Sequence, residues 1–233
     1  MLTIKAITGD ESYAAQHLSN NHSVGETITG QWMGRGAELL GLQGGVRMEE
    51  FEALCQGKHP STGELLKQRE NGDSARKLYD CTGYAPKAVS VMALEDPRVI
   101  EAHNAGVPAL ADEMELLAGA RIRKDGVNDT RLTSNLVIAR YDHTVSAELD
   151  PHIHSHLVAA NLTYDGVEGK WKALDARQMY AQSTYLTEVY RNAAAKVLNS
   201  LGYEIYQRVE HGWDIGIVGL SEELLQKFSR GES

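Results

Sequence analysis

Three histidines at alternate positions are the residues in this sequence best suited to chemistry. The segment Asp150-Pro-His-Ile-His-Ser-His-Leu-Val-Ala-Ala-Asn-Leu162 places imidazoles at His152, His154 and His156. Side chains alternate between the two faces of a β-strand, so these three imidazoles share one face. Imidazole binds metal ions and phosphates, and this spacing predicts a metal or phosphate site. A solvated polar face that gained its histidines by chance is the less favoured interpretation.

A fourth histidine, His143, is expected beside them. The sequence predicts β-strands over 132–143 and 152–163, and the connection over 144–151 is compatible with an antiparallel hairpin. In such a hairpin His143 ends one strand where the other begins. The spacing alone leaves two sets of three ligands open, either His152 or His143 together with His154 and His156.

The elements that must position this hairpin follow from apolar periodicity and from turn residues. The pattern predicts an α/β fold with a mostly antiparallel central sheet and flanking helices. Segments 19–29 and 57–74 are polar and predict loops. Strands are expected over 2–7 and 77–84, helices over 11–18, 36–40, 48–55, 87–94, 96–119 and 175–200, and then two short strands and a helix over 221–228.

Composition limits the class of protein. A chain of 233 residues with 42% hydrophobic content forms one large domain or at most two small ones. The net charge of −9 argues against a protein that holds nucleic acid by bulk charge alone. Two cysteines, Cys55 and Cys81, make no disulfide framework, so a reducing, cytoplasmic setting is expected. No apolar run reaches the length of a membrane span or a signal peptide, which predicts no membrane insertion.

One resemblance rests on the histidine segment alone. His152-Ile-His-Ser-His-Leu-Val158 is similar to the motif of the histidine-triad nucleotide hydrolases and transferases, in which the middle histidine attacks the α-phosphate. Ser155 stands where that family usually has an apolar residue, and residues 157–233 follow a motif that is usually near the end of the domain.

A second resemblance extends over about residues 2–205. It rests on Gln31-Trp-Met-Gly-Arg-Gly-Ala-Glu38, Leu78-Tyr-Asp-Cys-Thr-Gly-Tyr-Ala-Pro-Lys-Ala-Val-Ser-Val91, Ile100-Glu-Ala-His-Asn104 and the histidine segment itself. In this order, the segments resemble the successive motifs of the MobF-type conjugative relaxases (the TrwC/TraI group) of the HUH endonuclease superfamily.

The resemblance implies a palm-like HUH fold and a metal-dependent DNA transesterase. Such enzymes nick and rejoin single-stranded DNA at a plasmid transfer origin through a 5′-phosphotyrosine and so initiate conjugation. The implied cofactor is a divalent metal, Mg²⁺ or Mn²⁺. The implied partners are single-stranded DNA with an adjacent hairpin, accessory DNA-binding proteins and the coupling protein of a type IV secretion system.

Site residues also follow from the resemblance. The metal ligands would be His143, His154 and His156, with His152 beside them or at the DNA edge. Asp80 would orient a metal-bound histidine or help to deprotonate the nucleophile. That nucleophile would be Tyr13, which is the only tyrosine before Tyr79.

Basic residues flank the proposed catalytic strands and are candidates for phosphate contacts. Lys87, directly after Pro86 in a family motif, is the first candidate, followed by Lys77 and Arg76. Arg121, Arg123, Lys124, Arg131 and Arg140 lie in the same part of the sequence, and either Trp32 or Tyr84 is expected to stack on a base.

The sequence departs from the family pattern in three places. Ala14 follows Tyr13, and no tyrosine occurs in 19–29, although many members carry two tyrosine pairs. Ala147 stands near the place of a common arginine. Residues 1–233 are expected to form a relaxase domain without its C-terminal helical segment and without a helicase. Rolling-circle replication initiators, histidine-triad hydrolases and a noncatalytic DNA-binding module remain the alternatives.

Overall fold

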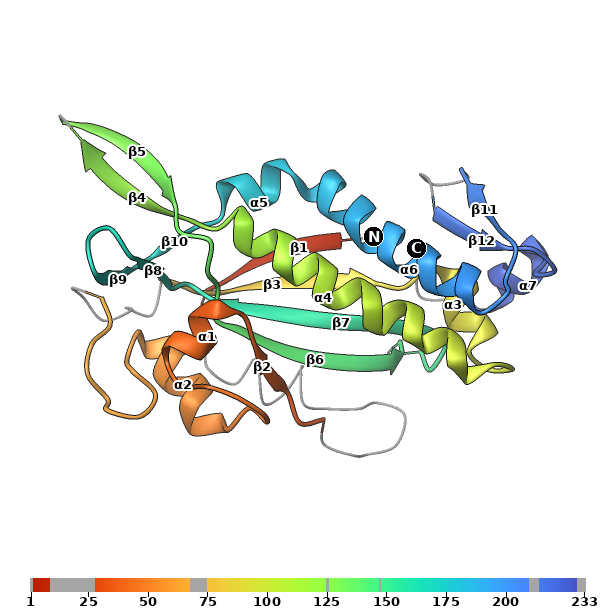
Figure 1. Cartoon of the computed structure of the whole chain (residues 1–233). Helices are drawn as coiled ribbons and strands as arrows, with labels where there is room; N and C mark the ends of the chain where they lie inside the picture. Colours follow the sequence, from red (N-terminus) through yellow and green to blue (C-terminus); the bar gives the residue numbers. More distant parts are fainter. Residues whose placement is uncertain are drawn as a thin grey trace.

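A five-stranded antiparallel sheet forms the centre of the molecule (Figure 1). The computed structural model describes residues 2–8, 28–67, 75–124, 126–146, 148–209 and 214–229. The strand order is β1-β3-β7-β6-β2, so β7 is central and β1 and β2 are the edges. The strands are β1 (Leu2–Thr8), β2 (Gln31–Met33), β3 (Arg76–Tyr84), β6 (Ile138–Val145) and β7 (Pro151–Ala160). The predicted α/β class with an antiparallel sheet is confirmed.

Helices cover both faces of this sheet. On one face α4 (Ile100–Leu116) and α6 (Ser183–Ser200) lie side by side (Figure 1). They bury the larger apolar core against alternate residues of the strands, including Leu157 and Ala159. On the other face α1 (Arg35–Leu39) and α2 (Met48–Gln56) pack on a second core that includes Val158 and Ala160. After His156, the residues of β7 are thus apolar on both faces of the sheet.

The predicted hairpin is formed by β6 and β7, and its register pairs His143 directly with His154. The first strand begins at Ile138 rather than at Leu132, which instead ends a different strand. Residues 133–137 have no regular secondary structure, because Asn135 and Thr133 bond to β8 and to the end of α4 instead of forming a ladder. The connection between β6 and β7 runs over 146–150 and is shorter than the expected 144–151.

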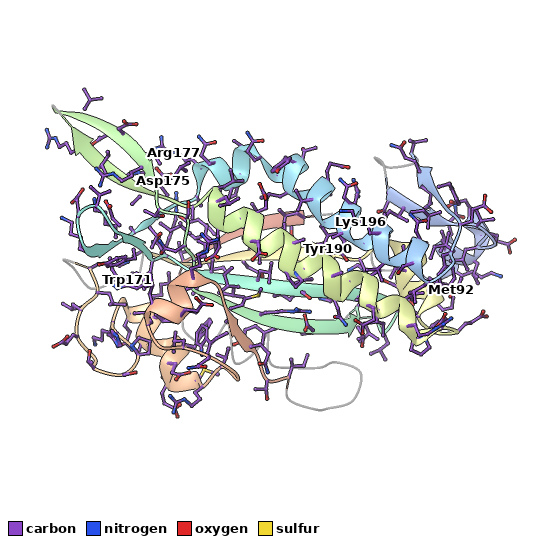
Figure 2. The ribbon with its side chains drawn as sticks, viewed as in Figure 1. Met92, Trp171, Asp175, Arg177, Tyr190 and Lys196 are labelled. Carbon is purple, nitrogen blue, oxygen red and sulfur yellow. The ribbon has the colours of Figure 1, made fainter. Side chains whose placement is uncertain are left out.

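A second hairpin, which the sequence pattern did not predict, projects from the body of the molecule (Figure 1). It consists of β4 (Gly119–Lys124) and β5 (Val127–Leu132), and β10 (Leu174–Asp175) pairs with β4 at its base. Asp175 accepts hydrogen bonds from Thr130 and Arg177 there (Figure 2).

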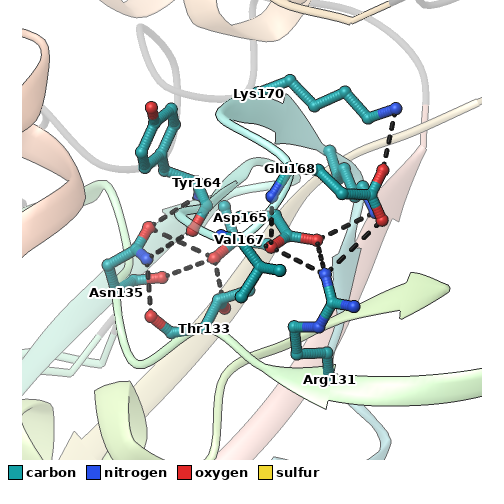
Figure 3. Close-up of polar contacts among 10 residues, drawn as sticks. Arg131, Thr133, Asn135, Tyr164, Asp165, Val167, Glu168 and Lys170 are labelled. Atoms are coloured by element: carbon teal, nitrogen blue, oxygen red, sulfur yellow. Dashed lines mark hydrogen bonds and ion pairs between the residues drawn. The ribbon is translucent and has the colours of Figure 1, made fainter.

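An ion-pair cluster lies near this base, formed by Arg131, Asp165, Glu168, Lys170 and Lys172 (Figure 3). Most of the cluster lies on the hairpin of β8 (Thr163–Asp165) and β9 (Lys170–Lys172). Asp165 is fully buried and accepts from Arg131 at 2.8 Å and from Lys172 at 2.9 Å. These cations hold the pKa of Asp165 well below its usual range.

The remaining elements complete the helical face. The long helix predicted over 175–200 is interrupted at Gln182, which separates α5 (Arg177–Ala181) from α6. The helix predicted over 96–119 is a 3₁₀ turn at Pro97–Val99 followed by α4. α3 (Lys87–Met92), β11 (Ile205–Arg208), β12 (Asp214–Ile217) and α7 (Glu222–Lys227) lie at the far end. Among the described helices, none is long and apolar enough to span a bilayer.

Candidate active site

Four histidines gather at one end of the central sheet, and we call His143, His152, His154 and His156 the histidine cluster. The ring centroids of His143, His154 and His156 are 5.0, 5.2 and 5.3 Å apart. The hairpin register explains this grouping, because His143 stands opposite His154 and the period of two brings His156 to the same face. The ring of His152 is 5.0 Å from that of His154.

Asp80 holds His156 in one orientation. Its two carboxylate oxygens lie 2.9 and 3.0 Å from Nδ1 of His156, and Thr82 donates to the same carboxylate at 3.1 Å. All three residues are on adjacent strands, with Thr82 paired to His156. A carboxylate only accepts hydrogen bonds, so His156 carries its proton on Nδ1 and has its lone pair on Nε2. Asp80 is 4% exposed, and its contact with His156 supports the orienting role.

His154 is also an Nδ1–H tautomer, but its hydrogen-bond partner is a backbone oxygen rather than a carboxylate. Its Nδ1 donates to the backbone oxygen of His152 at 2.7 Å, which leaves the lone pair on Nε2. Burial lowers the pKa of His154 to about 3, so the imidazole is neutral near pH 7. A neutral imidazole with a fixed tautomer is the form that binds a metal ion.

The donor chemistry of His143, His154 and His156 fits a divalent ion. Centroid spacings of about 5 Å are those of imidazoles around one ion bound at about 2.0–2.1 Å. Across the described ranges, however, no three His, Cys, Asp or Glu side chains already stand as a group able to hold a metal. The rings of His143 and His154 are stacked, with an interplanar angle of 15°.

Aromatic and basic residues border the cluster on one side. The ring of Tyr84 stacks on His154 with centroids 5.6 Å apart and lies 5.2 Å from the ring of His152. Nζ of Lys87 is 3.3 Å from the backbone oxygen of Pro151, directly before His152. The structure therefore brings Tyr84, Lys87 and His152 together at the edge of the histidine cluster.

The other predicted contact residues lie elsewhere. Arg76 and Lys77 begin β3, whereas the residues near its end pair with the histidines. Lys77 precedes Thr82 by five residues, which is about 17 Å along a strand. The expectation that Trp32 stacks on a base is wrong, because Trp32 is 8% exposed and its Nε1 donates to Glu50 at 2.9 Å.

Several parts of the prediction fall on residues outside the described ranges, including most of the loop expected over 19–29 and the end of the loop expected over 57–74. Two of them bear on the site. These are the proposed nucleophile Tyr13, with the helix expected over 11–18, and Ala147. Thr82, in contrast, is a polar residue of the site that sequence reasoning did not single out. The signal for Thr82 was its position two residues after Asp80 in a strand, which places both on one face.

Comparison with known proteins gives one consistent family. Residues 7–232 match the family model described as TrwC relaxase. The chain is 36% identical over 208 residues to the multifunctional conjugation protein TraI of Escherichia coli (strain K12). That alignment covers 84% of this chain and 12% of the relative, so this chain spans about one eighth of the relative's length.

Solved structures of a conjugative relaxase, TrwC, have the same fold. A complex with origin-of-transfer DNA in metal-free form is 30% identical, with a TM-score of 0.84, over 98% of this chain and 79% of that one. A copper-bound complex is 29% identical with a TM-score of 0.86, over 98% and 80% of the two chains. A third complex contains a 27-mer DNA comprising the recognition hairpin and the cleavage site, at 30% identity and a TM-score of 0.84 over 98% of this chain and 79% of that one. The chain belongs to the TrwC relaxase family.

Proposed function

We propose that this chain nicks and rejoins single-stranded DNA at a plasmid transfer origin and thereby initiates conjugative DNA transfer. The observation that supports this most directly is the histidine cluster, in which His154 and His156 are held as Nδ1–H tautomers beside a buried carboxylate. The related relaxase structures contain origin-of-transfer DNA, which supports the same substrate here.

The metal ligands in this proposal are His143, His154 and His156. These residues would hold a divalent ion, Mg²⁺ or Mn²⁺, which would supply electrostatic stabilisation of the charge that develops on the oxygens of the scissile phosphate. Metal-bound and copper-bound forms of the relative support a divalent ion in this family. Phosphate chemistry favours a hard cation, and imidazole ligands also accept Mn²⁺. Asp80 acts through His156 by fixing its tautomer and ring orientation.

The nucleophile is Tyr13, which lies in the connection between β1 and β2, the two edge strands of the sheet. β1 ends at Thr8, five residues before Tyr13 in the sequence. The assignment is supported by the resemblance to the relaxase family, which implies a nucleophile just after the first strand, and Tyr13 is the only tyrosine before Tyr79.

The reaction is a balanced exchange of two phosphate esters. The phenolate oxygen of Tyr13 forms a bond to the phosphorus, and the bond from phosphorus to the 3′ oxygen breaks. The 3′ oxygen takes up a proton, so the products are a 5′-phosphotyrosine and a free 3′ hydroxyl. The phosphodiester is conserved in the adduct, and the 3′ hydroxyl reverses the step when the strand is rejoined.

DNA contacts in this proposal come from Lys87 and His152 at the edge of the cluster, and from Lys77 and Arg76 farther along β3. The partner is single-stranded DNA with an adjacent hairpin, and the cellular setting is the cytoplasm, with accessory DNA-binding proteins and a type IV secretion coupling protein. In this proposal residues 1–233 form a relaxase domain. Replacement of Lys87 by Ala is expected to lower the salt dependence of DNA binding by about one counterion.

Adduct trapping tests the proposal. The wild-type chain, Tyr13→Phe and Tyr84→Phe are incubated with Mn²⁺ and labelled single-stranded oligonucleotides tiled across the transfer origin of the plasmid that encodes it. Tyr84→Phe is the matched control, because it removes the phenol that borders the histidine cluster. A covalent band on a denaturing gel is expected for the wild type and for Tyr84→Phe but not for Tyr13→Phe. EDTA should abolish the band.

Each other outcome has a defined meaning. A band that is lost only in Tyr84→Phe would assign the nucleophile to Tyr84. Hydrolysis of small nucleotides without metal, with no DNA adduct, would indicate histidine-triad chemistry. Tight hairpin binding without an adduct on any oligonucleotide would reject the transesterase and favour a DNA-binding module.

A further inference from the structure

A chain of hydrogen bonds lies on the face of the sheet opposite the histidine cluster, and it is buried except at its last member, Asp142, whose side chain is 50% exposed. It begins at Tyr190 on α6, whose hydroxyl is 2.6 Å from Nδ1 of His103 on α4. Nε2 of His103 is 2.7 Å from the hydroxyl of Ser155 on β7, which in turn contacts Asp142 on β6. Tyr190, His103 and Ser155 are each at most 3% exposed. Figure 2 marks Tyr190 between the two helices.

The direction of every hydrogen bond in this chain follows from its last member. Asp142 also accepts from Arg140 at 2.8 Å, and its carboxylate has no proton to give. Ser155 therefore donates its hydroxyl proton to Asp142 and must accept from His103. His103 is then the Nε2–H tautomer, and its Nδ1 accepts the proton of Tyr190. Burial lowers the pKa of His103 to about 4, which agrees with this neutral form.

The last two members of this hydrogen-bond chain, Ser155 and Asp142, are sequence neighbours of the proposed metal ligands. Ser155 separates His154 from His156 on β7, and Asp142 directly precedes His143 on β6. Ser155 and Asp142 are partners in the hairpin register, next to the pair of His143 and His154. A side-chain bond at that pair reinforces the backbone ladder at the position where register decides which imidazoles meet, because a slip of one residue would turn them to the other face.

A close approach of the two helices makes room for this arrangement. Gly106 lies on α4 one turn after His103, and a Cβ at that position would come within 2.5 Å of the ring of Tyr190. Only glycine permits the tyrosine to lie flat against α4 and reach His103. The ring of Tyr190 meets that of His103 edge-on, with centroids 5.7 Å apart. The local sequence is thus fitted to the hydrogen-bond chain.

We propose that His103 is a positioning residue for the histidine cluster, which it serves from the opposite face of the sheet. Through Ser155 and Asp142 it fixes the pairing of β6 with β7 and so sets the spacing of His143 from His154 and His156. The inference rests on the proposed assignment of these three histidines as metal ligands. His103 contacts neither DNA nor the metal in this role.

Variants of this protein can separate a positioning role of His103 from a role in stability. His103→Phe removes both ring nitrogens from the hydrogen-bond chain. His103→Gln is the conservative variant, because its amide offers a donor and an acceptor at nearly the spacing of the two imidazole nitrogens. Thr187→Val is the matched control: Thr187 is on α6, one turn before Tyr190, and its buried bond goes to the backbone of Leu2 rather than toward the histidines.

Two measurements test the proposal on the whole chain, both at a temperature where circular dichroism confirms that each variant is folded. In the metal-free protein, two-bond ¹H–¹⁵N spectra should assign His103 as the neutral Nε2–H tautomer. In Mn²⁺ titrations followed by electron paramagnetic resonance, the Kd should rise by about 10-fold or more in His103→Phe. It should remain within about 3-fold of wild type in His103→Gln and in Thr187→Val.

The outcomes distinguish a failure of the proposed metal site from a failure of the positioning role of His103. A wild-type chain that binds no Mn²⁺ would reject the proposed metal site, and this inference with it. Binding that is lost in His154→Ala but unchanged in His103→Phe would keep the site and overturn the inference alone. An Nδ1–H tautomer of His103 would also overturn it, because the hydrogen-bond chain would then run differently.

Discussion

In the ion-pair cluster, the carboxylate of Asp165 is held between the cations of Arg131 and Lys172, whereas in the histidine cluster Asp80 contacts the imidazole ring of His156. Both clusters bury a carboxylate almost completely. In the first, opposite charges satisfy each other and fix the β8–β9 hairpin (Figure 3). In the second, the carboxylate of Asp80 contacts only Nδ1 of His156, which leaves the lone pair of the ring on Nε2. The difference separates a cluster that supports the fold from one arranged for chemistry.

The largest expected effect follows from removing a proposed ligand. We expect His154→Ala to lower the nicking rate and the apparent Mn²⁺ affinity by at least about 10³-fold, because charge stabilisation at the phosphate depends on the ion. The free energy of unfolding should change by less than about 1 kcal/mol, because the ring is only half-buried. Oligonucleotide nicking and thermal denaturation measure the two quantities. A rate within ten-fold of wild type would remove His154 from the ligand set.

The reverse pattern is expected in the ion-pair cluster. Asp165→Ala leaves Arg131 and Lys172 without their shared carboxylate, and we expect a loss of about 3 kcal/mol in the free energy of unfolding. For a chain of this size the Tm should fall by about 6–12 °C. Nicking at 25 °C should remain within about two-fold of wild type. The matched control is Glu168→Gln at the exposed rim, for which a loss below about 1 kcal/mol is expected.

A smaller effect should follow from the orienting carboxylate. Asp80→Asn keeps an acceptor near Nδ1 of His156 but removes the charge, and we expect Mn²⁺ affinity to fall by about 10–100-fold. Thr82→Val removes only one donor to that carboxylate and should cost less than about 10-fold. Isothermal titration calorimetry gives both values. Equal losses in the two variants would argue that Thr82, rather than the charge of Asp80, orients the ring.

The smallest expected effect is a dependence of stability on pH. The pKa of His103 is about 4 in the folded chain, below the ordinary value of 6.5, so the unfolded state binds more protons between these values. Stability is therefore full above pH 6.5 and is lost as the pH falls toward 4. Between pH 7 and 5.5, His103 should contribute a loss of about 1 kcal/mol. Urea denaturation at each pH measures it, and the curve of His103→Gln should be flatter; identical slopes would contradict the buried neutral form.

The fold was predictable where the pattern of apolar residues was strong. β7 and β3 alternate or run apolar, and the histidine spacing within β7 placed three imidazoles on one face without any structure. The hairpin of β4 and β5 was missed because its residues are mostly exposed and polar, so they lack the apolar alternation that marks a half-buried strand. The break at Gln182 was missed because no proline or glycine marks it.

The grouping of the histidines was predictable from the sequence, but the residues that support them were not. His143 and His154 were expected to meet because a short connection joins their strands. His103 and Tyr190 bond across 87 residues of sequence, and the partner of such a pair is decided by how α4 and α6 pack on the sheet. Trp32 was named with Tyr84 as one of two candidates for base stacking on its residue type alone, yet a hydrogen bond to Glu50 holds it inside the second core.

The central place of β7 has a consequence for how the chain is made in the cell. β1 and β3 are the first strands that can pair, and β3 then exposes an open edge until β7 arrives beside it. Residues 85–150 must be synthesised in between, which takes on the order of several seconds at roughly 5–20 residues per second. Open strand edges promote aggregation, and such distant pairings fold slowly. Because the histidine-bearing strand is also the one that closes this edge, a substitution that weakens its pairing should lower the yield of folded protein as well as its activity.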